Sequence, residues 1–135
     1  MFRTSTGQTS FFTVDTYFPD ALPPEDWSFT YFNYVLPLID EEKFRHLFAE
    51  HGGAPNKPVK TTISILVFMG LEELTWRGAE FMFPRRFDWL IATGTPFGEA
   101  SIDHTTLYKF YQRMEADETA REMFIEIVNK FTELC

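Results

Sequence analysis

The chain has 135 residues, of which 44% are hydrophobic and 18% aromatic, and its net charge is −8. This length fits one domain, and so large an apolar fraction excludes a disordered chain. The longest apolar run, residues 63–71, has about half the length of a membrane-spanning helix, and polar residues follow Arg3 where a signal peptide would be apolar. We therefore expect a soluble, cytoplasmic protein with no membrane partner.

The acidic charge argues against nucleic acid as a partner, because lysine and arginine supply most non-specific affinity for phosphates. The charge is unevenly distributed, however. Residues 1–39 contain one basic and four acidic residues, residues 115–135 two basic and six acidic, and residues 40–114 nine basic and ten acidic. This nearly neutral middle can still present a basic face to DNA. A single cysteine, Cys135, excludes an internal disulfide and a thiolate metal cluster within the chain.

The first 39 residues are rich in aromatic residues and proline, and no helical period continues across Pro19, Pro23 and Pro24. They predict an extended, partly packed arm. Its aromatic side chains either wrap a helical core or pair with another subunit. Stacking of single-stranded bases on them is a weaker alternative, because no basic residues are interleaved.

Helical periodicity starts after this arm. The first predicted helix begins at Asp40, a candidate N-cap, and stops at the Gly52-Gly53 pair. The second, over residues 58–74, is apolar on nearly all sides and predicts a central buried helix. Gly70 inside it predicts the close approach of a neighbouring element.

The remaining helices are predicted from their capping residues. Thr75 is the expected N-cap of a short helix, and Gly94 closes the next one. Ser101 or Asp103 caps a further helix, and Asp117 caps the last. The fold class is therefore all-α, a compact multi-helical domain of five to seven helices.

Asp103-His104 is the only acid and histidine pair in the middle of the chain. A metal-dependent phosphohydrolase of the HD type requires the opposite order, together with further ligands on other helices. The other histidines, His46 and His51, lie together on one predicted surface helix. Asp103 is better explained as a helix cap.

Other enzyme signatures are missing from the sequence. It contains no Glu-x-x-His, no His-Glu-x-x-His and no Walker loop. The acidic pairs Glu41-Glu42 and Glu72-Glu73 are expected on solvated helix faces. We expect neither catalytic residues nor a metal or cofactor site in this chain.

The helix predicted around residues 102–114 combines an apolar stripe with a polar face. The stripe repeats at i, i+3, i+4 and i+7 and consists of Leu107, Phe110, Tyr111 and Met114. The opposite face presents Thr105, Tyr108, Lys109 and Gln112. Hydroxyl and ammonium groups contact phosphates and glutamine reads base edges, as a recognition helix requires. An ordinary amphipathic helix explains the same face equally well.

A partner for this helix precedes it. Residues 74–83 have a threonine cap, Arg77 and the small Ala79, which is typical of the first helix of a helix-turn-helix. Residues 84–100 separate the two helices, whereas the motif uses a turn of about 3 to 4 residues. The sequence thus predicts an interrupted helix-turn-helix.

Four segments in order and spacing resemble the N-terminal domain of bacterial insertion-sequence transposases of the InsH-like, DDE type. They cover roughly residues 40–114 and read Gly-Ala-Pro-Asn-Lys-Pro-Val, Leu-Thr-Trp-Arg-Gly-Ala-Glu, Arg-Phe-Asp-Trp-Leu-Ile-Ala-Thr-Gly and Ser-Ile-Asp-His-Thr-Thr-Leu-Tyr-Lys-Phe. The resemblance implies a bacterial helical domain that binds double-stranded DNA at the transposon's terminal repeats and helps to dimerise the transposase.

The resemblance also implies a following RNase H-like catalytic domain, in which three acidic residues hold two Mg²⁺. These acidic residues cannot be carried over to this chain, so Mg²⁺ is expected only for that absent domain. We expect the chain to be an excised domain or a truncated or repurposed copy. Its last motif departs from its relatives in having only Lys109 and Arg113 as basic residues, which predicts weak DNA affinity for the domain alone.

The predicted organisation is an arm over residues 1–39, a helix-turn-helix-like domain over residues 40–114 and an amphipathic helix over residues 115–135. The candidate DNA contacts are Lys57, Lys60, Arg77, Arg85, Arg86, Thr105, Thr106, Tyr108, Lys109, Gln112 and Arg113. The alternative is a protein-protein interaction module without DNA binding of its own. In it, the last helix pairs two subunits through Ala120, Met123, Phe124, Ile127, Val128, Phe131 and Leu134.

Overall fold

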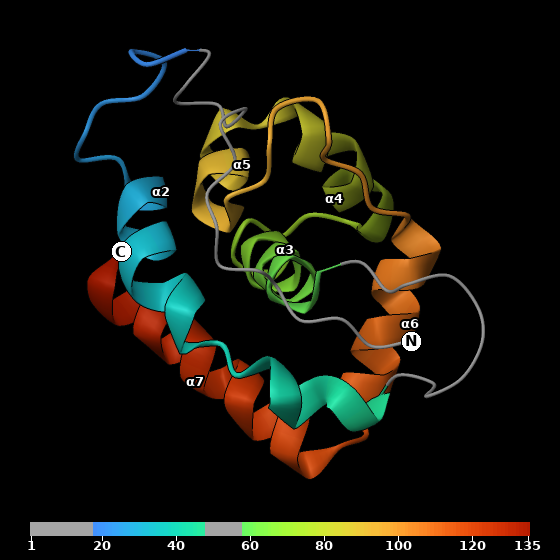
Figure 1. The fold of residues 1–135 in the computed structure, drawn as a ribbon. Coiled ribbons are helices and arrows are strands. Elements are labelled where there is room, and N and C mark those ends of the chain that lie inside the picture. The colour runs from blue at the N-terminus through green and yellow to red at the C-terminus, as the bar shows by residue number, and fades with distance from the viewer. Residues whose placement is uncertain (1–17, 48–57) are drawn as a thin grey trace.

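The computed structural model describes residues 18–47 and 58–135. These residues form helices and turns and no strand, which confirms the all-α class. Helix α3 (Val59–Leu71) lies at the centre with the other helices around it (Figure 1). In the described part of the chain, no helix is both long enough and apolar enough to cross a membrane.

Short elements alternate with longer helices along the chain. In order they are α2 (Trp27–Thr30), the π-helical turn η1 (Tyr31–Val35), the 3-10 turn η2 (Leu36–Leu38), the 3-10 helix η3 (Glu41–Leu47), α3, α4 (Trp76–Met82), the 3-10 turn η4 (Phe83–Arg85), α5 (Phe87–Thr93), α6 (His104–Glu115) and α7 (Glu118–Leu134).

Helix α3 is the buried centre that its apolar sequence predicts, since Val59 and every residue from Thr62 to Phe68 are buried. It ends at Leu71, three residues before the predicted end, because the chain turns at Glu73 with a left-handed φ of 56°. Gly70 is exposed, and a Cβ added there would meet no atom within 4 Å. The predicted close approach at this glycine is therefore wrong.

The segment from Trp27 to Leu38 corrects the prediction of an extended N-terminal arm. It is helical, and Tyr31 and Val35 are fully buried in the core. Pro23 and Pro24 precede α2, and Pro37 stands in the first turn of η2, where proline costs no helical hydrogen bond. Pro37 thus starts a helical turn, and Pro23 and Pro24 lie outside the helix instead of interrupting it. Residues 1–17 of the predicted arm lie outside the described residues.

An aromatic cluster joins this N-terminal segment to the centre of the fold. The Tyr31 ring lies with its centroid 4.9 Å from that of Phe68 and 5.5 Å from that of Phe131, both edge to face. Trp27 packs edge to face on Phe68 at 5.1 Å, and Trp89 of α5 lies 5.5 Å from the same ring. Aromatic pairs of this geometry add about 0.5–1.5 kcal/mol each to the burial of their apolar surface.

The helix predicted from Asp40 to the Gly52-Gly53 pair is described only to Leu47, and this part is a 3-10 helix instead of an α-helix. Asp40 does accept a hydrogen bond from the N–H of Glu42 (3.1 Å). Glu41 is only 6% exposed, which contradicts its predicted place on a solvated face. Its carboxylate accepts the backbone N–H of Lys60 at 3.4 Å in the first turn of α3, where a negative charge is favourable.

Candidate functional site

Helix α6 begins where a capping aspartate was predicted. Asp103 is the N-cap, and its Oδ1 accepts the N–H of Thr105 at 2.7 Å. This backbone hydrogen bond, with the nearby charge of His104 as a smaller cause, lowers the pKa of Asp103 below its usual value. The predicted apolar stripe packs inward, because Leu107, Phe110 and Met114 are buried. The helix is thus fixed in its rotation.

The opposite face of α6 is open to solvent and carries the predicted DNA contacts. They are all exposed: Thr105, Thr106, Tyr108, Lys109, Gln112 and Arg113. The Tyr108 ring packs edge to face on Trp76 of α4 at 5.2 Å, and Gln112 Nε2 donates to the Tyr108 hydroxyl at 3.1 Å. Among the described residues, neither Lys109 nor Arg113 forms an ion pair with an acidic side chain.

Helices α4 and α6 pack directly against each other despite the long segment between them. Thr75 caps α4 as predicted, with its hydroxyl accepting the N–H of Gly78 at 2.9 Å. Trp76, the first residue of α4, contacts both Tyr108 and Tyr111 of α6, with centroids 5.2 Å and 5.4 Å apart. Helix α5 is inserted between them in the chain and ends at Gly94, which adopts the left-handed conformation.

The other basic residues that were predicted to contact DNA differ in their exposure and in their contacts. Arg77 is exposed on α4, and Lys60 is half-buried on α3. Arg85 is exposed, its guanidinium lies 3.9 Å from the centroid of the Phe81 ring and it donates to the Phe81 carbonyl at 2.8 Å. Lys57 lies outside the described residues.

Arg86 is half-buried, and two acidic side chains hold its charge. Its guanidinium is held in two-point contacts by Glu72 (2.8 and 3.2 Å) and by Asp88 (2.9 and 2.7 Å). Glu72 also accepts the indole N–H of Trp89 at 3.1 Å. The hydrogen bonds to Asp88 and then Glu72 raise the pKa of Arg86 above its usual value. Arg86 thus ties the end of α3 to α5, and Glu72 is exposed, as predicted, while it makes these contacts.

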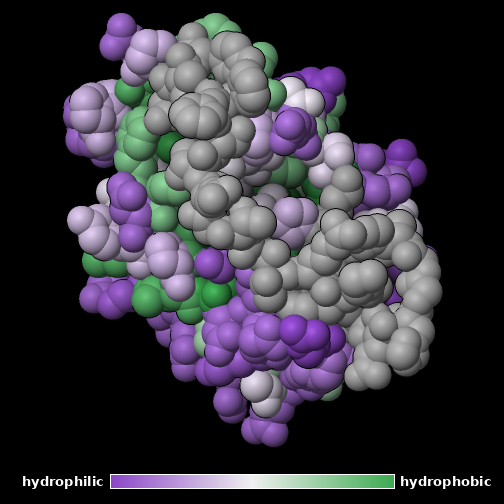
Figure 2. Space-filling model, viewed as in Figure 1, coloured by the Kyte–Doolittle hydropathy of each residue, from purple (hydrophilic) through white to green (hydrophobic). Residues whose placement is uncertain are grey.

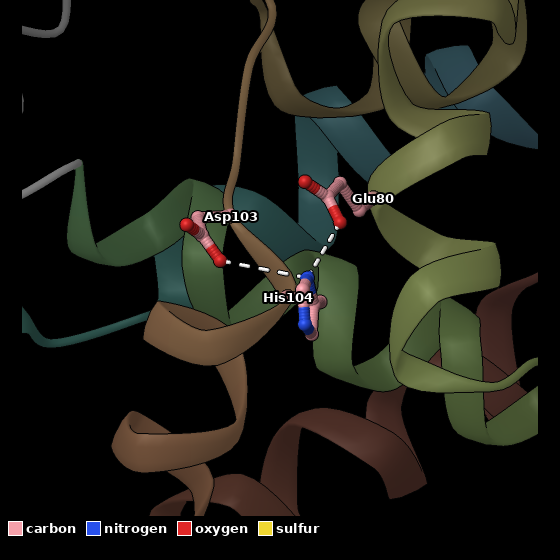
Figure 3. Close-up of side chains that lie close together, drawn as sticks. All are labelled: Glu80, Asp103 and His104. Carbon is pink, nitrogen blue, oxygen red and sulfur yellow. Dashed lines mark hydrogen bonds and ion pairs between the residues drawn. The ribbon is translucent and has the colours of Figure 1, made fainter.

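A second group of side chains lies at the start of α6. His104 Nδ1 is 2.8 Å from Glu80 Oε2 of α4 and 3.6 Å from Asp103 Oδ1. In Figure 3 the two carboxylates approach the same ring nitrogen from different sides. Because an ionised carboxylate only accepts hydrogen bonds, Nδ1 carries the proton toward Glu80. Glu80 was not predicted as a site residue; it is 24 residues from His104 and meets it only because α4 packs on α6.

A simpler pair occurs at the start of α7. His46 Nε2 lies 2.8 Å from Asp117 Oδ1, and Asp117 caps α7 by accepting the N–H of Ala120 at 2.8 Å. The backbone hydrogen bond from Ala120, followed by the contact with His46, lowers the pKa of Asp117 below its usual value.

Hydrophilic side chains dominate the lower part of the surface view, over η3 and the start of α7 (Figure 2).

Comparison with known protein families finds one match over most of the chain. Residues 19–113 match the model of the family described as "Transposase domain (DUF772)". No curated protein and no solved structure matches the chain. The matched range begins before α2 and includes α4, the interrupting α5 and nearly all of α6. The chain therefore belongs to the Transposase domain (DUF772) family.

Proposed function

We propose that this domain binds double-stranded DNA for a transposase, recognising transposon end sequences with α6 as the reading helix. The observation that carries the proposal is the exposed polar face of α6 within a chain of a transposase family. An α-helix fits the major groove, which is about 12 Å wide. Helix α6 has 12 residues. One side of the helix packs on the core, so the opposite side is available to the groove.

The exposed side chains supply both kinds of contact that specific binding needs. The hydroxyls of Thr105 and Thr106 and the charges of Lys109 and Arg113 suit phosphates, which position a protein on DNA. Gln112 suits the edge of adenine, with which a glutamine side chain makes two hydrogen bonds. The contacts of Tyr108 with Trp76 and Gln112 restrict these side chains before DNA arrives.

Flanking cations complete the proposed interface. Arg77 of α4 is exposed, and the residue before it packs on α6. Lys57, Lys60 and Arg85 remain candidates for phosphate contacts. Arg86 serves the fold instead, because two carboxylates balance its charge. With acidic residues following α6, we expect the isolated domain to bind DNA weakly at physiological salt.

The competing proposal is a helical interaction module without DNA binding. Its pairing seam on α7 is largely occupied within the chain, since Ala120, Met123 and Ile127 are buried and Phe131 packs in the aromatic cluster. Other apolar side chains, such as Leu38 and Ile125, are exposed and available to a partner. The DNA experiment decides between the two proposals.

The test is selection of bound duplexes from a randomised DNA pool, followed by titration of the selected duplex over a range of salt. We expect enrichment of one sequence, with affinity falling as salt rises. Failure to enrich any sequence, together with no salt-dependent binding, would reject the DNA-binding proposal in favour of the interaction module.

Replacing Lys109 tests whether α6 itself lies on the DNA. Lys109→Ala should weaken binding to all sequences and reduce the slope of log affinity against log salt by about 0.9, the contribution of one phosphate. Lys43→Ala is the matched control, because it removes the same charge from the exposed side of η3. Equal effects of the two substitutions would show that the loss of any exposed positive charge weakens DNA binding. Lys109 would then be excluded from the interface.

A further inference from the structure

Three potential metal ligands from two helices meet at one point where α4 packs on the start of α6. One donor atom from each of Glu80, Asp103 and His104 lies within 4.8 Å of the others. Around a first-row divalent ion, with bonds of about 2.0–2.2 Å, neighbouring ligand atoms lie about 3.0–3.4 Å apart. The observed separations from His104 Nδ1, 2.8 Å and 3.6 Å, bracket that range. Small side-chain rotations would bring the donors to metal-binding distances.

We propose that Glu80, Asp103 and His104 form a binding site for a divalent first-row transition-metal ion. His104 contributes Nδ1, whose proton the ion displaces into solvent so that the neutral ring keeps its proton on Nε2, and each carboxylate contributes one oxygen. The sequence predicted no metal site in this chain, because Asp103 and His104 alone lack a third ligand and Glu80 belongs to another helix.

The donor set determines the class of ion. One imidazole nitrogen with two carboxylates suits zinc or manganese, whereas magnesium and calcium prefer oxygen ligands alone. Two carboxylates beside a neutral imidazole carry two negative charges, so a divalent cation neutralises the repulsion between them. The side chains of Glu80 and His104 are 40% and 31% exposed, which leaves space for water molecules to complete the coordination shell.

The surroundings of the site also match those of metal ligands. A ligating histidine usually directs its second ring nitrogen to a hydrogen-bonding partner, which orients the ring. Here Nε2 of His104 lies 3.4 Å from the hydroxyl of Thr105. The N–H of the same threonine holds Oδ1 of Asp103 at 2.7 Å. Thr105 therefore helps to orient two of the three ligands.

The pair of His46 and Asp117 provides an internal comparison. The two side chains also lie 2.8 Å apart at the start of a helix, but no second carboxylate joins them in the described part of the chain. A difference in metal binding between the two histidines thus isolates the contribution of the three-ligand arrangement.

The experiment is calorimetric titration of the full chain with zinc chloride, repeated with manganese chloride, together with thermal unfolding with and without each salt. We expect one zinc ion per chain and a higher Tm, because the ion links α4 to α6 in the folded state only. Glu80→Gln and Asp103→Asn should each weaken zinc binding at least about tenfold, and His104→Ala should do the same.

The variants preserve the fold by design. Asparagine caps helices as well as aspartate does, and glutamine still accepts a hydrogen bond from His104. His46→Ala should leave zinc affinity unchanged. The proposal is overturned if neither zinc nor manganese binds, or if the affinity survives all three substitutions at the site. Neither outcome affects the proposed DNA binding, which is measured without added metal.

Discussion

Tyr31 shows how one side chain connects distant parts of the chain. Its ring is fully buried, and its hydroxyl donates to Ser64 Oγ of α3 at 2.7 Å across 33 residues. Ser64 in turn donates to the carbonyl of Lys60 at 2.7 Å. Burial raises the pKa of Tyr31 above its usual value, which favours the protonated phenol that donates to Ser64.

Tyr31→Phe should destabilise the protein by about 1 kcal/mol, because the ring stays packed while one buried hydrogen bond is lost. The free energy of unfolding in urea measures this loss. Tyr34→Phe is the control on the same turn, where the side chain is 64% exposed, and should have almost no effect. An equal cost at both positions would mean that the Ser64 contact contributes nothing specific.

Capping residues stabilise the ends of α4, α6 and α7. Thr75, Asp103 and Asp117 all cap the helices for which they were predicted, and each accepts a backbone N–H. Gly94 closes α5 with a φ of 66°, and a Cβ there would lie 2.7 Å from a ring carbon of Phe32. Caps were predictable because they depend on the few residues around a helix end.

The cap at Asp117 predicts a dependence of stability on pH. Its pKa is lower in the folded protein, so its carboxylate stabilises the fold at pH above its unfolded pKa and loses this contribution as pH falls through the folded pKa. Asp117→Asn should therefore be less stable than the wild type near about pH 7, and the difference should vanish toward about pH 2.

Urea unfolding over this pH range measures the difference. Asp20→Asn, in the exposed turn before α2, should follow the wild-type curve. A constant gap between Asp117→Asn and the wild type at every pH would show that the hydrogen bond matters and the charge does not.

At the scale of the whole molecule, α7 covers the core from one side. Its apolar residues were predicted to form either core or a seam between subunits; Ala120, Met123 and Ile127 are buried, Phe131 packs on the aromatic cluster, and Leu134 is exposed. Phe131 contacts Trp27 at 5.4 Å, Tyr31 at 5.5 Å and Phe68 at 6.1 Å. The C-terminal helix thus closes over the segment that was expected to be an arm.

Phe131→Asp should cost roughly 3 kcal/mol or more, because it removes a large, partly buried side chain that packs on three aromatic rings and places a charge among them. Ile125→Asp, on the 51% exposed side of the same helix, should change stability by no more than about 0.5 kcal/mol. Urea unfolding of both variants measures the change in stability, and sedimentation measures whether each variant is a monomer or a dimer. A stable Phe131→Asp protein whose mass falls from dimer to monomer would establish the intermolecular seam instead.

The sequence alone predicts the all-α class, the buried α3, the caps and the two faces of α6. These features follow from hydrophobic periodicity and from residues near helix ends, both of which act within a few positions along the chain. The family resemblance rested on the same local segments. Local reasoning failed where proline-rich sequence was taken as extended, since Pro23 and Pro24 precede the helical segment and Pro37 stands in a first turn, where helix permits it.

Local patterns could not show which helices meet, because that depends on the tertiary structure. Packing of α4 on α6 brings Glu80 to His104, and packing of α3 on α5 pairs Arg86 with Glu72 and Asp88. Packing of α7 on the N-terminal segment places Phe131 in the aromatic cluster. These contacts join residues far apart in sequence, and their partners depend on how apolar faces fit together in space, which no local pattern records.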